Sequence, residues 1–179
     1  MNYEEKILTY LVENYRKSKK DLGDHKTNRR TQVKPEKMYK KYNANDGDFE
    51  EITKLNLAVE NLTKLAFVYS TKETFGTQIQ AIFLVDERVQ DAEEYLAQTY
   101  GYISKDVQLA KLKNLIDTYQ KSSLICEKEC VELFALLTKR KIPKNLQELD
   151  DVFKAVAFIE NNQENLYLGE MSMKVYGDS

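Results

Sequence analysis

The sequence contains few of the residues from which catalytic and metal sites are most often built. It has one histidine and two cysteines among 179 residues, and its six glycines are scattered rather than gathered into a phosphate-binding loop. His25 alone can form neither a metal-ligand set nor a catalytic triad. Cys126 and Cys130 are two ligands short of a zinc site, so we expect both in the core of a helical region. We therefore expect no catalytic residue, metal ligand or cofactor in this chain.

Long apolar runs are also lacking. No run approaches the roughly 18 residues that a membrane helix needs, and the first residues lack the basic-then-apolar order of a signal peptide. Two cysteines cannot form a disulfide framework, which fits a reducing compartment. An apolar fraction of 42% with 31% charged residues is ordinary for a globular protein. We expect a folded cytoplasmic protein with no membrane partner.

Positive charge is concentrated in one short segment. From Arg16 to Lys41 the sequence holds 11 Lys or Arg residues against three acids, whereas the residues after Lys41 hold 15 basic and 23 acidic side chains. The formal net charge of −2 hides this asymmetry. A basic segment of this kind favours an anionic partner, most commonly nucleic acid. The alternative is a solvated loop between two helices.

Hydrophobic periodicity predicts a mainly α protein that begins with a winged helix. Apolar residues at helical spacing indicate three helices, over residues 3–19, 35–42 and 49–65. The pattern then changes to alternation, which indicates two strands, over residues 66–70 and 78–84. A short extended piece at 31–33 precedes Pro35, which suits the first turn of a helix. Three helices, an extended piece and a β-hairpin in this order are typical of a winged helix, which we expect over residues 1–85.

The second half of the sequence predicts a helical subdomain over residues 86–163. Its expected helices span residues 86–99, 104–121, 123–139 and 146–161. The remaining segment, 164–179, contains an alternating run from Leu166 to Tyr176. This alternation predicts a C-terminal strand.

The expected nucleic-acid contacts are the cations of the basic segment and of the hairpin. Neutral hydrogen-bonding residues such as Asn28 and Gln32 lie among them, and such groups position a duplex through its phosphates without reading its sequence. The third helix of a repressor-like winged helix enters the major groove, but here it opens with acids that repel phosphates, so we expect no base readout from it. The predicted DNA-binding residues are Arg16, Lys17, Lys19, Lys20, Lys26, Arg29, Arg30, Lys34, Lys37, Lys40, Lys41 and Lys72.

Short motifs in the first hundred residues and at the end of the chain are similar to those of a known family. They are the runs Tyr3–Leu8, Tyr15–Lys19, Asn28–Arg30, Val33–Tyr39, Asp86–Arg88 and Met171–Ser179. On these motifs the chain resembles the amino-terminal region of JetD, the nuclease subunit of the bacterial Wadjet plasmid-defence system. The final run is similar to the stretch that leads into the catalytic half of that family.

The resemblance implies a specific role. JetD-like proteins are dimers with winged-helix DNA-binding parts ahead of a metal-binding Toprim domain, and they cut plasmid DNA presented by an SMC-type complex. The Toprim acids have no counterpart in this sequence, so no catalytic residue carries over, and divalent metal is expected only in a following domain. The resemblance therefore implies a non-catalytic arm that binds double-stranded DNA.

Two other functions fit the residues. The acidic second half would suit a protein-interaction scaffold that docks onto an SMC–kleisin complex, with the basic segment merely solvated. A winged-helix transcription regulator is the third hypothesis, although the acidic start of the third helix disfavours it.

Overall fold

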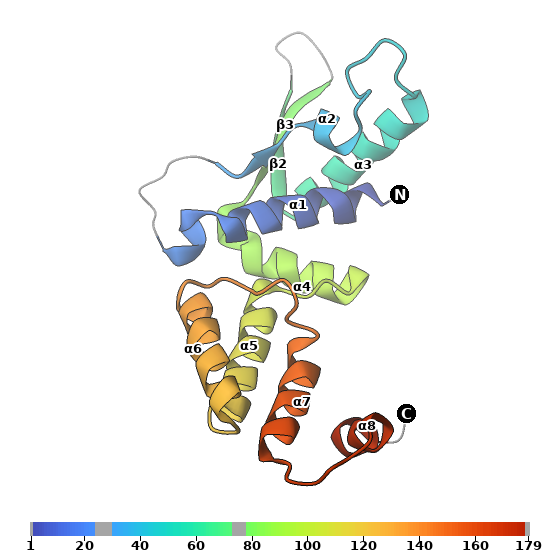
Figure 1. The fold of residues 1–179 in the computed structure, drawn as a ribbon. Helices are drawn as coiled ribbons and strands as arrows, with labels where there is room; N and C mark the ends of the chain where they lie inside the picture. Colours follow the sequence, from blue (N-terminus) through green and yellow to red (C-terminus); the bar gives the residue numbers. More distant parts are fainter. Residues whose placement is uncertain (1, 24–29, 73–77, 178–179) are drawn as a thin grey trace. The chain divides into compact units, whose positions relative to one another are not determined.

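The computed structural model describes residues 2–23, 30–72 and 78–177, and it divides the chain into two units, residues 1–104 and 105–179 (Figure 1). Both units are mainly helical, and the first also contains a small antiparallel sheet. The predicted mainly α fold class is therefore confirmed.

The first unit begins with α1 (Tyr3–Lys17), whose apolar side faces the core. The side-chain oxygen of Asn2 accepts hydrogen bonds from the backbone N–H groups of Glu4 and Glu5 and so caps this helix. The prediction extended the helix to Lys19. It ends earlier because Ser18 adopts an extended conformation and caps the following 3-10 turn, η1 (Lys19–Leu22).

The sheet has the strand order β1-β3-β2, with β1 (Gln32–Val33) and β2 (Val68–Lys72) both antiparallel to β3 (Ile79–Leu84). Between β1 and β2 the chain forms α2 (Pro35–Met38) and α3 (Phe49–Lys64). This matches the predicted sequence of helices, extended piece and hairpin. The predicted second helix is shorter than expected, since its last residues form turns.

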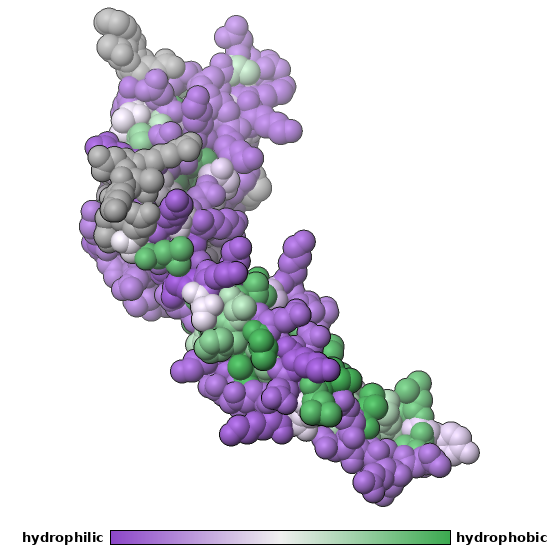
Figure 2. Space-filling view, turned by 60° about the vertical axis from the view of Figure 1, so that its left-hand side comes forward, coloured by the Kyte–Doolittle hydropathy of each residue, from purple (hydrophilic) through white to green (hydrophobic). Residues whose placement is uncertain are grey.

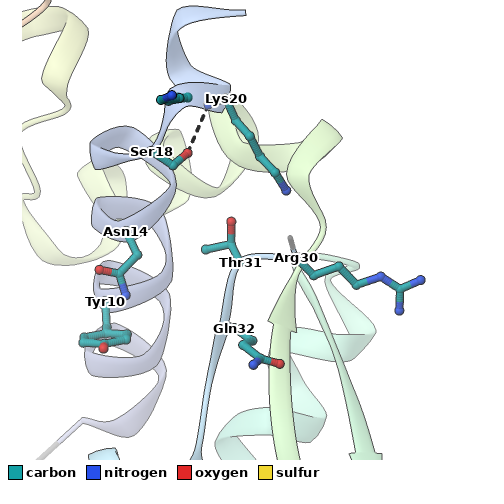
Figure 3. Close-up of a pocket in the computed structure, with 8 residues that line it drawn as sticks. Tyr10, Asn14, Ser18, Lys20, Arg30, Thr31 and Gln32 are labelled. Atoms are coloured by element: carbon teal, nitrogen blue, oxygen red, sulfur yellow. Dashed lines mark hydrogen bonds between the residues drawn. The ribbon is translucent and has the colours of Figure 1, made fainter. Parts of the chain in front are cut away.

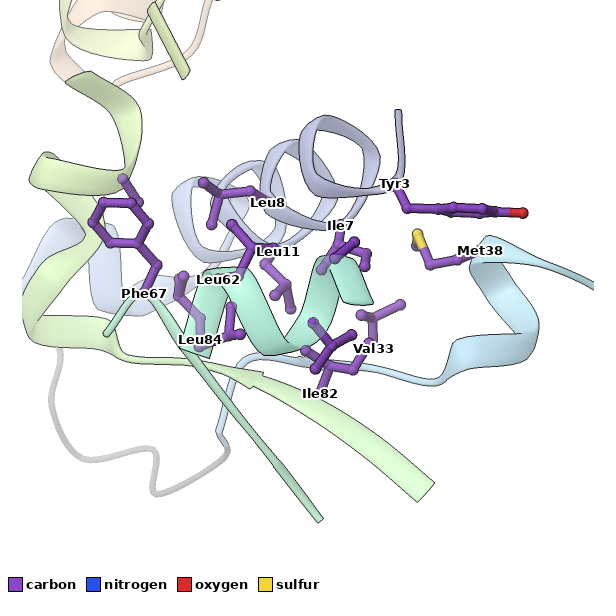
Figure 4. Close-up of a cluster of buried hydrophobic side chains, with 14 of the residues drawn as sticks. Tyr3, Ile7, Leu8, Leu11, Val33, Met38, Leu62, Phe67, Ile82 and Leu84 are labelled. Atoms are coloured by element: carbon purple, nitrogen blue, oxygen red, sulfur yellow. The ribbon is translucent and has the colours of Figure 1, made fainter. Parts of the chain in front are cut away.

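The core of the first unit lies between α1, α3 and the inner face of the sheet. Figure 4 shows the apolar side chains of these elements pointing toward one another. The labelled members are Tyr3, Ile7, Leu8, Leu11, Val33, Met38, Leu62, Phe67, Ile82 and Leu84. Buried Tyr42 joins this core, and its hydroxyl accepts from the N–H of Ile79 and donates to Asn56 of α3. The hydroxyl is thereby satisfied, as burial requires.

The boundary of the first unit lies after Ser104 rather than at the predicted residue 85. A short 3-10 turn, η2 (Asp86–Arg88), leads into α4 (Val89–Tyr100). The buried residues Val89, Ala92 and Leu96 of α4 belong to the same core cluster as α1. Sequence alone could not assign α4, because its apolar stripe fits a core on either side of the boundary.

The second unit has its own core, formed by α5 (Lys105–Tyr119), α6 (Leu124–Thr138) and α7 (Leu149–Asn161). Cys126 and Cys130 are free thiols buried in this core. Burial raises the pKa of the Cys130 thiol, which fits a structural rather than a reactive cysteine. The prediction of core cysteines is confirmed. Among the described helices, none is long and apolar enough to cross a membrane.

The predicted C-terminal strand is wrong, because Leu168–Tyr176 forms a helix, α8. The backbone N–H of Tyr167 donates to the side chain of Glu170, which closes the first turn. Leu168, Met171 and Val175 share one face at helical spacing, a pattern that the apparent alternation concealed. A strand would also need a sheet partner, whereas α8 packs only against α7 among the larger contacts of the described chain.

Candidate nucleic-acid interface

Arg16 is a buried structural residue, which contradicts its predicted role in DNA binding. Its Nε donates to Glu93 Oε1 at 3.0 Å, a second guanidinium nitrogen pairs with Glu93 Oε2, and a third donates to Asp21 at 2.8 Å. Only 9% of the Arg16 side chain is exposed. Its charge is thus balanced by two carboxylates inside the unit.

Lys20 is likewise engaged within the fold. Its ammonium forms an ion pair with Asp86, and only 13% of its side chain is exposed. Lys20 is therefore mostly buried and paired, where the sequence predicted an exposed cation. The partners Asp86 and Glu93 stand about 70 residues further along the chain and approach the end of α1 only because α4 packs against that helix. A local count of acids could not find them.

Two other predicted cations form ion pairs at the surface. Lys17 pairs with Glu13 at 2.9 Å and Lys41 pairs with Asp46 at 2.6 Å, and all four side chains are well exposed. Exposed pairs of this kind contribute roughly 0–1 kcal/mol. Either lysine could therefore exchange its carboxylate for a phosphate at small cost.

Six predicted cations are exposed and have no ion pair within the described residues. Arg30 lies just before β1, Lys19 lies in η1, and Lys72 ends β2. The complete set is Lys19, Arg30, Lys34, Lys37, Lys40 and Lys72. The remaining two predicted residues, Lys26 and Arg29, lie outside the described residues, as does His25.

A polar pocket of about 420 Å³ brings part of this set together (Figure 3). One wall comes from α1 and the turn after it, and the other comes from β1 and the two residues before it. The pocket is lined by Tyr10, Asn14, Ser18, Lys19, Lys20, Arg30, Thr31 and Gln32. Cations interleaved with hydroxyl and amide groups are suited to phosphate oxygens. We call this the α1–β1 pocket.

A second pocket of about 420 Å³ shares Tyr10 with the α1–β1 pocket and contains Lys37. Lys6 also lines it, but its ammonium donates to the carbonyl oxygen of Met38. Glu5 and Glu13 lie in the same pocket. The positive surface is therefore interrupted by carboxylates on this side of α1.

The outer face of α3 is close to neutral. Glu50 pairs with Lys54 and Glu60 pairs with Lys64, each at 2.8 Å. The hydrogen bond from Lys64 lowers the pKa of the Glu60 carboxyl. These paired side chains offer little net positive charge to a major groove, which agrees with the expectation that α3 does not read bases.

A groove of about 480 Å³ separates α3 from β2 and contains Lys72. Its lining is mixed, with apolar Leu57 and Ile79 beside polar Asn56 and Ser70. Lys72 therefore lies apart from the α1–β1 pocket, in a different depression of the same unit.

Sequence reasoning missed Tyr10 and Asn14, which line the α1–β1 pocket from α1. The signal available was their position on α1, within about two turns of the basic residues that end the helix. Thr31 lies in the segment that was read as a short extended piece, but its place in the pocket was not predicted.

Comparisons with family models, with curated proteins and with solved structures found no match to this chain.

Proposed function

We propose that this chain is a non-catalytic DNA-binding module that contacts the backbone of double-stranded DNA. The observation that carries the proposal is the group of exposed cations, Lys19, Arg30, Lys34, Lys37 and Lys40, which have no carboxylate partner within the described residues. They lie within 22 consecutive positions of one unit. Unpaired surface cations at this density favour a polyanion.

The proposed mechanism is electrostatic. Each phosphate that meets a lysine or arginine releases condensed counterions, so the affinity falls linearly with salt on a logarithmic scale, with a slope of about −0.9 per phosphate. Asn14, Thr31 and Gln32 of the α1–β1 pocket supply uncharged hydrogen bonds that fix the orientation of the backbone. This mechanism gives binding that is independent of sequence.

We further propose, from the resemblance to JetD, a larger assembly for this module. In that setting the chain is the DNA-engaging arm of a dimeric plasmid-cleaving nuclease in the bacterial cytoplasm, and an SMC-type complex presents the DNA. In that family, divalent metal and the cutting reaction belong to a Toprim domain. This placement rests on the shared motifs of the first hundred residues and of the final run.

A charge-reversal experiment tests the duplex-binding proposal. The double variant Arg30→Glu with Lys34→Glu should weaken binding to a 20-base-pair duplex by at least about tenfold and reduce the salt slope by about two. The matched control reverses Lys111 and Lys113, two exposed lysines of α5, which alters the net charge equally. Equal losses in both variants would show that only net charge matters and would reject the site.

A protein-interaction scaffold is the second candidate function, and one observation favours it. Of the 16 large hydrophobic residues that are exposed in the described chain, 11 belong to the second unit. Figure 2 shows such apolar side chains gathered on one face of that unit. On α6, Leu124, Val131 and Phe134 are more than half exposed. Exposed apolar patches of this kind mark protein-binding surfaces.

The charge around this α6 face defines the partner that it would fit. Three glutamates and one lysine, all exposed, lie on the helix as Glu127, Lys128, Glu129 and Glu132. We therefore expect an amphipathic helix with basic flanks rather than a second acidic copy of the chain. A helical leucine/lysine peptide should bind the wild type and lose affinity for Val131→Glu. Equal binding of a leucine/glutamate peptide would contradict this function.

A further inference from the structure

The outer face of the small sheet carries an aromatic pair. Tyr69 of β2 and Phe83 of β3 are cross-strand partners, and their rings stack with centroids 5.0 Å apart and an interplanar angle of 9°. Val68, Ile82 and Leu84 on the same strands are buried in the core, whereas both rings remain partly exposed. Alternation therefore turns these two aromatic side chains away from the core.

Two polar side chains complete this face. Gln32 is the partner of Phe83 across β1 and β3, so Gln32, Phe83 and Tyr69 form one row across the sheet. The guanidinium carbon of Arg30 lies 5.9 Å from the centroid of the Tyr69 ring, which is a cation–π contact. We call Arg30, Gln32, Tyr69 and Phe83 the aromatic face.

The aromatic face is continuous with the α1–β1 pocket. Arg30 and Gln32 line that pocket and also belong to the row of stacked rings. Cations that suit phosphates therefore adjoin a planar stack, with one exposed amide beside it. Intact duplex offers phosphates to such a surface, but it keeps its bases stacked inside the helix, out of reach of the rings.

A cross-strand aromatic pair also stabilises a hairpin through side-chain packing. That role accounts for the contact between Tyr69 and Phe83. It does not account for an unpaired guanidinium over the ring and an amide at the end of the row. Stacked rings, an arginine plane and an amide are together the chemistry that recognises unpaired bases.

We propose that the aromatic face binds an unpaired nucleotide where a single strand emerges from the duplex. The unpaired base adds to the stack of Arg30, Tyr69 and Phe83 at its exposed end, and the amide of Gln32 hydrogen-bonds to a base edge. The phosphates of the adjoining duplex lie along the cations of the α1–β1 pocket. This inference rests on the proposed duplex binding and narrows its substrate to DNA with a strand end or junction.

The test compares the full chain on two probes of the same 20-base-pair sequence. One probe is a blunt duplex, and the other carries a three-nucleotide overhang with 2-aminopurine at its first unpaired position. Stacking of one base on an aromatic side chain changes affinity from about fivefold to about a hundredfold. We expect the overhang probe to bind about tenfold more tightly, and its 2-aminopurine fluorescence to be quenched on binding.

Single-residue variants test whether the rings of Tyr69 and Phe83 cause the preference for the overhang probe. Tyr69→Leu and Phe83→Leu keep an apolar side chain and remove the ring, so each should bring the affinity ratio of the two probes close to one. Tyr176→Leu, which removes an exposed tyrosine ring from α8, is the matched control and should leave the ratio unchanged. Circular dichroism of each variant verifies the fold.

The outcomes separate this inference from the function on which it rests. Equal affinity for both probes, with unquenched 2-aminopurine, overturns the inference and leaves duplex binding intact. A preference that survives in both leucine variants overturns it as well, because the rings would then have no part in it. Absence of binding to either probe rejects the proposed function and this inference together.

Discussion

Removing one partner of the buried ion pair between Arg16 and Glu93 should strongly destabilise the first unit. The variant Glu93→Gln removes the negative charge and leaves the guanidinium in a site where only 9% of its side chain is exposed. Breaking a buried pair by removing one partner costs about 3–5 kcal/mol. Asp21 still accepts a hydrogen bond at 2.8 Å, so we expect the lower end, about 3 kcal/mol.

Urea unfolding followed by far-ultraviolet circular dichroism measures this loss, and hydrogen exchange of α1 peptides assigns the transition to the first unit. The matched control is Glu13→Gln, which breaks the exposed pair with Lys17. That variant should change the free energy of unfolding by less than about 1 kcal/mol. A Glu93→Gln protein as stable as the control would refute the assignment of Arg16 as a buried structural cation.

Further predictions concern Lys20 and the second unit. Lys20→Ala should destabilise the first unit, because it leaves Asp86 without its ion-pair partner, and urea unfolding would measure the loss. Phe153→Ala should cost about 3–5 kcal/mol, since this buried ring packs 5.4 Å from the Tyr119 ring, and thermal unfolding would reveal it. Burial, together with the hydrogen bond to Asp150, raises the pKa of Tyr119 to about 12 from 10.0. The fold thus favours the neutral phenol, so the contribution of Tyr119 to the free energy of unfolding is complete below pH 10 and is lost as the pH rises toward 12. An equal free energy of unfolding at pH 9 and pH 12 would contradict this.

The helices and the hairpin of the first unit could be predicted because each has a local signal. Asp48 caps α3 through a hydrogen bond to the backbone N–H of Glu50, as its position suggested. Pro35 begins α2, where its missing N–H costs nothing. The tail was predicted wrongly because alternation and helical spacing coincide over the nine residues of α8.

The candidate site was less predictable, because the fate of a cation depends on residues far away in sequence. Arg16 and Lys19 look alike in a linear count of charge, yet Arg16 is buried against Glu93 and Lys19 is exposed. The aromatic face could not be predicted from the sequence either, because the strand register that aligns Tyr69 with Phe83 depends on tertiary pairing. The packing of α4 and of the turn before it brings the partners of Arg16 and Lys20 into place, and no local pattern encodes that packing.

The most direct test of duplex binding is a titration of the wild-type chain with a plain duplex at 50 and 200 mM salt. If about four phosphates are contacted, the dissociation constant should rise on the order of a hundredfold between these two conditions. A dissociation constant that is the same at both salt concentrations, or no binding at 50 mM, would contradict the electrostatic mechanism.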